Sequence, residues 1–206
     1  ALLYAIGRKS NTDTLNLENT SIQIDEKSFI IRNELFETTA KGVYVVGDAS
    51  GKHMLQHAAA YEVNHLGKIL LEECTEPLHF KYMPHAVFTE PEIASVGITE
   101  QKAKEQNIEY VTTTTNWIAS AKAMSTRLNY PITKFIINPK NYEILGCHMI
   151  GPESSTMMHQ VLAVMHINND VRHLKEMLYI HPALSEALLP ASVEAVREVE
   201  KYNKNL

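Results

Sequence analysis

The chain has 206 residues, and its 19 lysines and arginines against 24 aspartates and glutamates give a formal net charge of −5. This balance excludes a strongly basic nucleic-acid surface. A hydrophobic share of 45% is typical of a globular protein, and no apolar stretch approaches the ~18 residues of a membrane-crossing helix. Only two cysteines, Cys74 and Cys147, are present, which excludes a disulfide framework and favours the cytoplasm.

Residues 1–6 form an apolar run that begins without an initiator methionine. Such a run is typical of a buried strand that has lost its neighbours. We therefore expect the chain to be the C-terminal part of a longer protein. A turn-rich stretch beginning at Gly7 follows the run and leads into a connector.

The next part of the chain predicts short strands followed by one helix. Strand-like pieces occupy residues 21–25 and 29–32, and the β-branched run 42–46 predicts a central strand that stops at Gly47 and Asp48. Apolar residues at helical spacing then predict a helix over 55–73. In open α/β sheets a junction of strand, loop and helix is where ligands bind.

The pattern breaks between residues 75 and 84, and we place a domain boundary between 75 and 76. Strands followed by packed helices predict an α+β fold with an antiparallel sheet, preceded by a partial α/β segment. The predicted elements are strands at 86–89 and 93–97, a helix at 100–106 capped by Thr99, a strand at 110–117, a hairpin of 133–138 and 142–150, helices at 154–167 and 171–178, and a last helical stretch from Pro182 towards Tyr202, interrupted or restarted at Pro190.

His181 and Glu186 are the sharpest candidates for catalysis. Proline is favoured at the first position of a helix, so Pro182 would place His181 at the cap and Glu186 about one turn further in. A carboxylate on one imidazole nitrogen leaves the other free to exchange a proton near neutral pH, as a general acid/base requires. The alternative interpretation is a polar helix cap with a surface glutamate.

Gly47 and Asp48, with residues 54–57 at the start of the predicted helix, form a second candidate site. An acid after a central strand accepts a hydrogen bond from a sugar-like hydroxyl, and the N–H groups at a helix start face an electron-rich ligand atom. A nucleotide cofactor is held in this way. The alternative is a simple turn with a capping aspartate.

The ten histidines do not predict a metal site. His53 and His57 are an i, i+4 pair, but no cysteine or carboxylate completes a set of ligands. Cys74 and Cys147 lie far apart in different predicted domains, and we interpret them as structural thiols. We expect no bound metal.

Several short motifs, taken in their order, resemble one known family. The motifs are Ala5-Ile6-Gly7-Arg8, Val45-Val46-Gly47-Asp48, Phe88-Thr89-Glu90-Pro91-Glu92 with Ala94-Ser95-Val96-Gly97, Leu145-Gly146 with Gly151-Pro152, and His181-Pro182 through Ser185-Glu186. With these motifs the chain resembles the C-terminal half of the pyridine nucleotide-disulfide oxidoreductases, above all the dihydrolipoamide dehydrogenases, with mercuric and mycothione reductases as relatives.

The resemblance implies a division of the chain and a set of cofactor contacts. Residues 1–75 would be a remnant of the NAD-domain strand and the FAD-binding domain, and residues 76–206 the interface domain that pairs two subunits. Gly7 would contact the nicotinamide dinucleotide, and Asp48 would bind the ribityl chain of FAD. The loop beside the flavin ring would comprise Met54, Leu55, Gln56 and His57.

The resemblance also implies the chemistry. His181 would be the acid/base for a dithiol substrate, either small or carried on a lipoyl domain, and Glu186 would orient it. The pair would reach across a homodimer to the flavin and disulfide of the partner. The chain has Tyr179 where dihydrolipoamide dehydrogenases usually have histidine, and Ala183 where they usually have threonine.

The chain contains neither the GxGxxG motif that holds a dinucleotide pyrophosphate nor a C-x4-C redox pair. We therefore expect FAD and NAD(P) to belong to the complete protein and this fragment to bind neither. The alternative function is a dimerisation or binding module that is catalytically inert when isolated. The vicinal C-terminal cysteines typical of mercuric reductase are also absent from the sequence.

Overall fold

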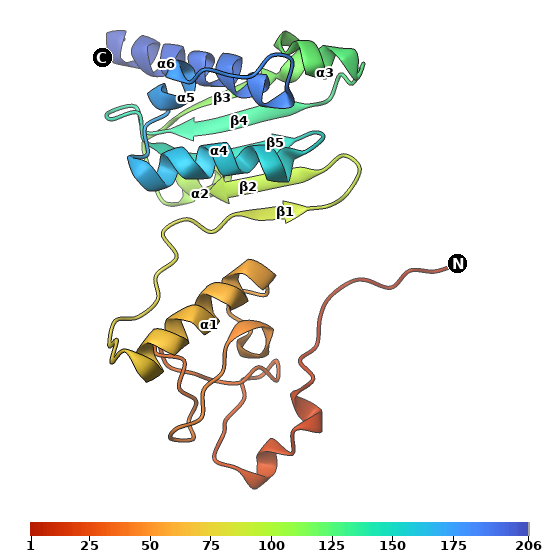
Figure 1. Ribbon diagram of the computed structural model, residues 1–206, viewed down its shortest axis with the longest axis vertical. Helices are drawn as coiled ribbons and strands as arrows, with labels where there is room; N and C mark the ends of the chain where they lie inside the picture. The colour runs from red at the N-terminus through yellow and green to blue at the C-terminus, as the bar shows by residue number, and fades with distance from the viewer. Residues whose placement is uncertain (206) are drawn as a thin grey trace. The chain divides into compact units, whose positions relative to one another are not determined.

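The computed structural model describes residues 1–205, which form two compact units (Figure 1). The first unit is Ala1–Phe80, and the second begins at Lys81. The sequence-based boundary lay between residues 75 and 76, inside the connection after the first unit's helix. Each unit has its own packed interior and is described by itself.

The first unit contains one long helix, α1 (Gln56–Leu71), and three short 3₁₀-helices at Thr12–Thr14, Leu17–Asn19 and Gly47–Ser50. The predicted helix over 55–73 is confirmed to within two residues at its C-terminal end. Leu55 is the N-cap of α1, with extended backbone and no side-chain hydrogen bond. The helix therefore begins directly after an extended segment, as the predicted junction requires.

The strands predicted in the first unit do not form as regular strands in the structure. Residues 1–6 are extended but pair with no strand in the described part of the chain, and Leu2 is 93% exposed. A strand of a parallel sheet needs neighbours for its N–H and C=O groups, and no strand among residues 1–205 pairs with residues 1–6. Residues 21–46 instead form isolated antiparallel bridges, Ile24 with Ile30, Arg32 with Thr38 and Glu37 with Tyr44.

The second unit is built on a five-stranded sheet in the order β1-β2-β5-β4-β3. Every neighbouring pair is antiparallel, and a bulge at Ile136/Ile137 interrupts the β4–β5 register. The predicted hairpin is confirmed, and so is the α+β class. The strands are β1 (His85–Val87), β2 (Ile93–Gly97), β3 (Val111–Asn116), β4 (Ile132–Ile137) and β5 (Ile144–Ile150).

Five helices accompany the sheet: α2 (Glu100–Glu105), α3 (Ala121–Ser125), α4 (Ser154–Ile167), α5 (Arg172–Glu176) and α6 (Leu188–Lys204). The Thr99 cap is confirmed, because its Oγ1 accepts the N–H of Lys102 at 3.1 Å. The last helical stretch was predicted to be interrupted or restarted at Pro190. The structure shows a restart just before it, because α6 begins at Leu188 after a 3₁₀-helix over Leu184–Ala187. Pro190 is the third residue of α6, where a backbone N–H has no partner inside the helix. The short helix α3 was not predicted.

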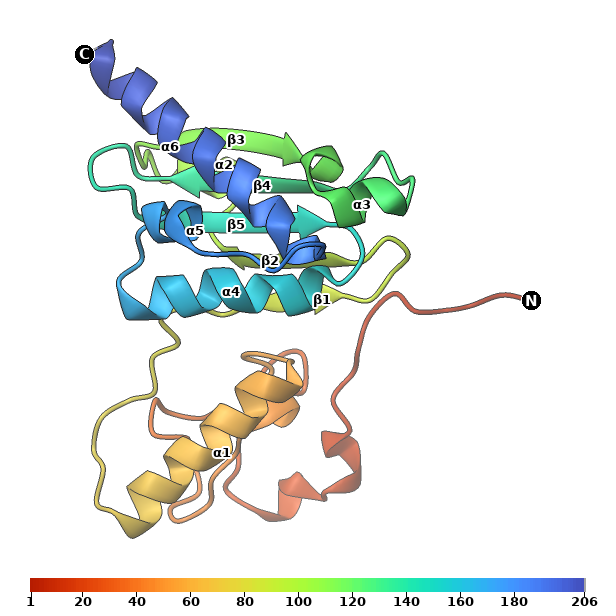
Figure 2. The same cartoon turned by 45° about the horizontal axis from the view of Figure 1, so that its top comes forward.

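The core of the second unit lies between the sheet and the helices that cross one of its faces (Figure 2). α4 packs on β2 and β5, while α6 packs on β3 and β4 and against α5. Glu92 fixes the start of α4, since its carboxylate accepts the N–H of Ser155. Among residues 1–205, no helix is both long and apolar enough to cross a membrane. The largest fully buried core side chains are Trp117, Phe135, Ile137, Ile144, Met149, Met158, Met165, Leu174 and Leu188.

Candidate active site

The loop that carries His181 connects α5 to a 3₁₀-helix, Leu184–Ala187, that precedes α6. Ala183 is the N-cap of this 3₁₀-helix and Glu186 is its third residue. The prediction that Pro182 begins the last helix with His181 at its cap is therefore wrong. The helical part starts later because the Glu186 carboxylate folds back and accepts the N–H of Ala183, which has extended backbone.

His181 and Glu186 contact each other directly, as the sequence predicts for an acid/base pair. Nδ1 of His181 lies 2.7 Å from Oε1 of Glu186, and Oε2 accepts the N–H of Ala183 at 2.8 Å. The His181 side chain is 68% exposed and that of Glu186 only 19%. A carboxylate held by a backbone N–H fixes one side of the imidazole ring, and Nε2 lies on the other side, where substrate can approach.

The Glu186 carboxylate remains ionised below the usual glutamate range. The hydrogen bond with His181, followed by that from Ala183 N–H, lowers the pKa of Glu186. The stabilisation from this contact is present above the ordinary glutamate pKa and is lost as the pH falls through the lowered value. At neutral pH the carboxylate favours the imidazole with its hydrogen on Nδ1, so that Nε2 is the basic nitrogen. This arrangement can take a proton from a thiol and return it.

Tyr179 anchors the loop on the N-terminal side of His181. Its hydroxyl donates to the carbonyl of Leu174 in α5 at 2.8 Å, and burial raises the pKa of Tyr179 to about 12. The phenol therefore stays protonated and keeps donating at any ordinary pH. In contrast, the neighbouring apolar side chains are exposed, Leu178 by 99% and Ile180 by 79%. The loop therefore carries two exposed apolar side chains just before His181.

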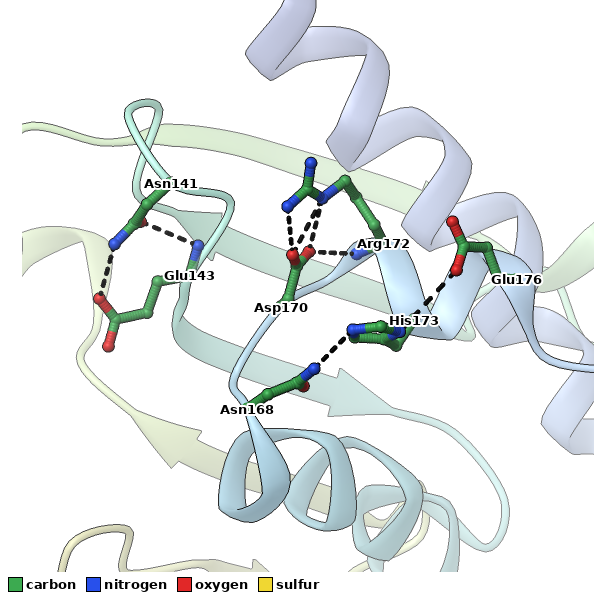
Figure 3. Close-up of polar contacts among 7 residues, drawn as sticks. All are labelled: Asn141, Glu143, Asn168, Asp170, Arg172, His173 and Glu176. Atoms are coloured by element: carbon green, nitrogen blue, oxygen red, sulfur yellow. Dashed lines mark hydrogen bonds and ion pairs between the residues drawn. The ribbon is translucent and has the colours of Figure 1, made fainter.

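α5, which supplies the Leu174 carbonyl, is itself held by a cluster of polar contacts (Figure 3). The Asp170 carboxylate accepts the backbone N–H of Arg172 at 2.9 Å and also binds its guanidinium. His173 pairs with Asn168, at the end of α4. Figure 3 also draws the β4–β5 turn, where the backbone N–H of Glu143 donates to Asn141. The cluster fixes the connection from α4 into α5, and so the start of the loop that carries His181.

The first unit has a cleft of about 690 Å³ beside Asp48. Nη1 of Arg8 lies 3.7 Å from Oδ2 of Asp48 and donates to the carbonyl of Met54 at 3.2 Å. The structure therefore brings together the two ends of the predicted cofactor site, residues 7–8 and 48–54. The cleft is lined by Arg8, Lys9, Ser10, Asn11, Thr12, Thr14, Leu15, Phe29, Asp48, Ala49 and Met54.

The remaining predicted cofactor residues flank this cleft in sequence. Gly7 precedes Arg8 in an exposed segment, and a Cβ added to Gly7 would meet no atom within 4 Å. Leu55, Gln56 and His57 follow Met54 as the N-cap and first two residues of α1. The N–H groups of a helix's first turn have no partners within the helix, so they can bind an electron-rich ligand atom.

Glu62 is a site residue that sequence reasoning missed. Its side chain is buried in the middle of α1, where Oε1 binds Nη2 of Arg32 at 2.6 Å and Oε2 accepts the N–H of Gly47 at 2.6 Å. The Arg32 guanidinium also stacks over the Phe36 ring, 4.5 Å from its centroid. Glu62 thus ties α1 to the turn that presents Asp48. A charged residue in an apolar stripe of the predicted helix was the signal available.

The other titratable candidates lie outside these two sites. Burial raises the pKa of the Cys147 thiol, so it remains protonated and is a poor nucleophile. In the part of the chain that the structure describes, no three histidine, cysteine, aspartate or glutamate side chains are grouped to hold a metal ion. His53 instead packs edge-on against Phe80, with ring centroids 5.3 Å apart.

Two protein-family models match the chain. The model described as pyridine nucleotide-disulphide oxidoreductase, dimerisation domain, matches residues 83–192. The model described as pyridine nucleotide-disulphide oxidoreductase matches residues 1–62. The two matches fall on the second and the first compact unit respectively.

Curated relatives match along nearly the whole chain. A dihydrolipoyl dehydrogenase of Buchnera aphidicola subsp. Acyrthosiphon pisum is 32% identical over 191 residues, which is 91% of this chain and 40% of the relative. Dihydrolipoyl dehydrogenase 3 of Haloarcula marismortui is 28% identical over 204 residues, or 99% of this chain and 42% of the relative. The chain therefore spans about two fifths of the length of these relatives.

Solved structures match as well. The HOCl-induced flavoprotein disulfide reductase RclA from Escherichia coli aligns with a TM-score of 0.84 and 26% identity, covering 89% of this chain and 42% of that one. LpdA from Mycobacterium tuberculosis aligns with a TM-score of 0.81 at 24% identity, covering 94% of this chain and 41% of that one. Because LpdA is only 24% identical to this chain, the match with LpdA shows a shared fold alone.

Proposed function

The chain belongs to the pyridine nucleotide-disulphide oxidoreductase family, and from this premise we propose that it is the C-terminal part of an FAD-dependent dithiol/disulfide oxidoreductase that uses NAD or NADP. Its dihydrolipoyl dehydrogenase relatives favour a dithiol substrate of that kind, small or attached to a lipoyl domain. The observation that carries the proposal is the His181–Glu186 pair, with Nδ1 and Oε1 2.7 Å apart.

In this proposal His181 moves the proton of the substrate thiol. Nε2 takes the proton as the thiol becomes a thiolate, and the resulting imidazolium is stabilised by the Glu186 carboxylate at Nδ1. The same nitrogen returns the proton to a leaving thiolate when the reaction runs in the other direction. The Ala183 N–H keeps Glu186 in position throughout. A bound flavin would supply the transfer of electrons between the dithiol and the nicotinamide cofactor.

The first unit's residues fit the sugar-like part of such a flavin. Asp48 offers an exposed carboxylate at a cleft of about 690 Å³, and the start of α1 offers backbone N–H groups. We assign Asp48 the ribityl contact, Met54, Leu55, Gln56 and His57 the segment beside the ring, and Gly7 the nicotinamide dinucleotide. Residues 1–75 are then the remnant of the cofactor domains, and residues 76–206 the interface domain.

Asp48→Ala in the complete protein is expected to weaken flavin binding by about 10- to 100-fold, because hydrogen bonds to a charged group are worth about 1.5–3 kcal/mol. The measurement is the dissociation constant of FAD for the apoprotein, from quenching of flavin fluorescence. The control is Glu18→Ala, another exposed acid of the same unit. Equal FAD affinity in Asp48→Ala and wild type would remove Asp48 from the site.

The second unit is proposed to pair with another copy of itself, as the matched dimerisation-domain model suggests. Exposed apolar side chains around the His181 loop, chiefly Leu178 and Ile180, support an interface there. This pairing is also the alternative function, because the isolated chain would then be a dimerisation module without catalysis. We also propose a cytoplasmic location, because both cysteines, Cys74 and Cys147, are free thiols, as is usual in a reducing compartment.

Sedimentation equilibrium of the 206-residue chain is expected to give a dimer at micromolar concentration. Leu178→Glu should raise the dimer dissociation constant by about tenfold or more, because a charge placed in an interface loses its water. Leu71→Glu, at an exposed leucine of the first unit, is the matched control. A strict monomer in wild type, or equal effects of the two substitutions, would contradict the proposed interface.

A further inference from the structure

Ser120 lies far from His181 in sequence but contacts the same loop. It is the N-cap of α3, and only 1% of the residue is exposed. Its hydroxyl donates to the carbonyl of Ala183 at 3.1 Å across 63 residues of chain, and its oxygen also accepts the N–H of Ala123. A hydroxyl has one donor and two acceptor positions, so Ser120 can cap α3 and bind the His181 loop at the same time.

Ala183 is the point through which this contact reaches the imidazole. Its N–H donates to Oε2 of Glu186 at 2.8 Å, and the other carboxylate oxygen lies 2.7 Å from Nδ1 of His181. Hydrogen bonds therefore run from Ser120 to Ala183, to Glu186 and to His181. The three contacts measure 3.1, 2.8 and 2.7 Å, and this series begins at a buried residue and ends at an exposed one.

The His181 ring depends on this chain of contacts for its orientation. The side chain is 68% exposed, so packing alone does not hold the ring. Tyr179 fixes the loop before His181 by donating to Leu174, and Ser120 fixes it after His181 by donating to Ala183. The Ala183 carbonyl also accepts the backbone N–H of Glu186, at the longer distance of 3.3 Å. Without the Ser120 hydrogen bond only this longer contact holds the carbonyl, so the backbone of Ala183 can rotate and its N–H holds the Glu186 carboxylate less firmly against Nδ1.

We propose that Ser120 is a positioning residue of the His181–Glu186 pair, acting through the backbone of Ala183. The inference rests on the proposed function only for its consequence in catalysis. Its structural content, that the Ser120 hydroxyl keeps the hydrogen of neutral His181 on Nδ1, is a property of this chain without cofactor or substrate.

The test is the tautomer of neutral His181, read from its two ¹⁵N chemical shifts in the 206-residue chain. Wild type is expected to hold the hydrogen on Nδ1, and Ser120→Ala to give a mixture of both tautomers. Ser120→Thr keeps the hydroxyl and is expected to restore the wild-type shifts. Ser125→Ala is the matched control, since its hydroxyl donates to the carbonyl of Lys122 within the same short helix. Trp117 fluorescence during urea unfolding measures whether the second unit remains folded.

A lower unfolding midpoint with unchanged His181 shifts would make Ser120 merely structural and overturn the inference. If Ser120→Ala does not fold, Ser120→Gly replaces it, because glycine is also accepted at an N-cap. In the complete protein, Ser120→Ala is expected to lower kcat for dithiol oxidation by roughly tenfold with little change in KM.

The two proposals fail in different ways. Changed shifts in Ser120→Ala together with full activity of His181→Gln would support the positioning role and contradict the proposed function. Unchanged shifts and unchanged kcat in Ser120→Ala, together with an inactive His181→Gln, would support the proposed function and contradict the positioning role of Ser120.

Discussion

His181→Gln in the complete protein is expected to lower kcat for dithiol oxidation by about two to four orders of magnitude, the usual contribution of a positioned acid/base. Glutamine keeps the size and polarity of the side chain but cannot take up a proton near neutral pH. The structure gives the reason to expect a large effect, because Glu186 lies 2.7 Å from Nδ1 and orients the ring. Steady-state kinetics with a saturating dithiol measures the loss.

Two further variants sharpen this prediction. Glu186→Gln is expected to give a smaller loss than His181→Gln, because the histidine remains but loses its charged partner. His159→Gln, at an exposed histidine of α4, is the matched control and should retain wild-type turnover. Wild-type kcat in His181→Gln, or an equal loss in His159→Gln, would contradict the role assigned to His181.

Glu62→Ala is expected to cost the first unit about 3–5 kcal/mol, because removing one partner of a buried ion pair leaves the other charge uncompensated. Arg32 would be left buried without its carboxylate, and the N–H of Gly47 would lose its acceptor. Hydrogen exchange of the α1 amides in the 206-residue chain measures this loss. Their exchange should accelerate by about two to four orders of magnitude, or protection should vanish.

The single tryptophan provides an internal control for this prediction. Trp117 lies in the second unit, so its unfolding transition should not change in Glu62→Ala. Asn64→Ala, an exposed residue of the same helix, controls for helix propensity. Exchange of the α1 amides within threefold of wild type in Glu62→Ala would show that the ion pair does not hold the unit together.

A double variant separates the two contacts of Glu62. Replacing both charges, as in Arg32→Leu with Glu62→Leu, is expected to recover much of the loss, since paired apolar substitutes for a buried ion pair are often neutral. The recovery should stay incomplete because the N–H of Gly47 still lacks its acceptor. The remaining deficit measures how strongly Glu62 holds the turn before Asp48.

The second unit was largely predictable from its sequence because its elements are completed within the chain. The β4–β5 hairpin and α4 carry clear periodicity, and each finds its partner among neighbouring elements. In contrast, residues 1–6 and 42–46 have strand-like sequences but no sheet to join, so they are extended or only bridged. Local pattern predicts a strand only where the rest of its sheet is present.

In the candidate site, too, local contacts could be predicted from the sequence and long-range contacts could not. The spacing of His181 and Glu186 predicted their contact, but Pro182 suggested the wrong helix start, because the carboxylate itself forms the cap at Ala183. Glu62 and Ser120 carried no motif. Their roles depend on partners 15 and 63 residues away along the chain, which only the tertiary fold brings together.

The central claim, that His181 handles the thiol proton, is tested most directly by rapid mixing of the complete protein and its His181→Gln variant. Flavin absorbance follows reduction by a dithiol in one experiment and by NADH or NADPH in another. The account predicts that His181→Gln slows the dithiol reaction by about two orders of magnitude or more and leaves the nicotinamide reaction unchanged. Equal rates for the dithiol reaction in both proteins, or equal slowing of both reactions, would contradict it.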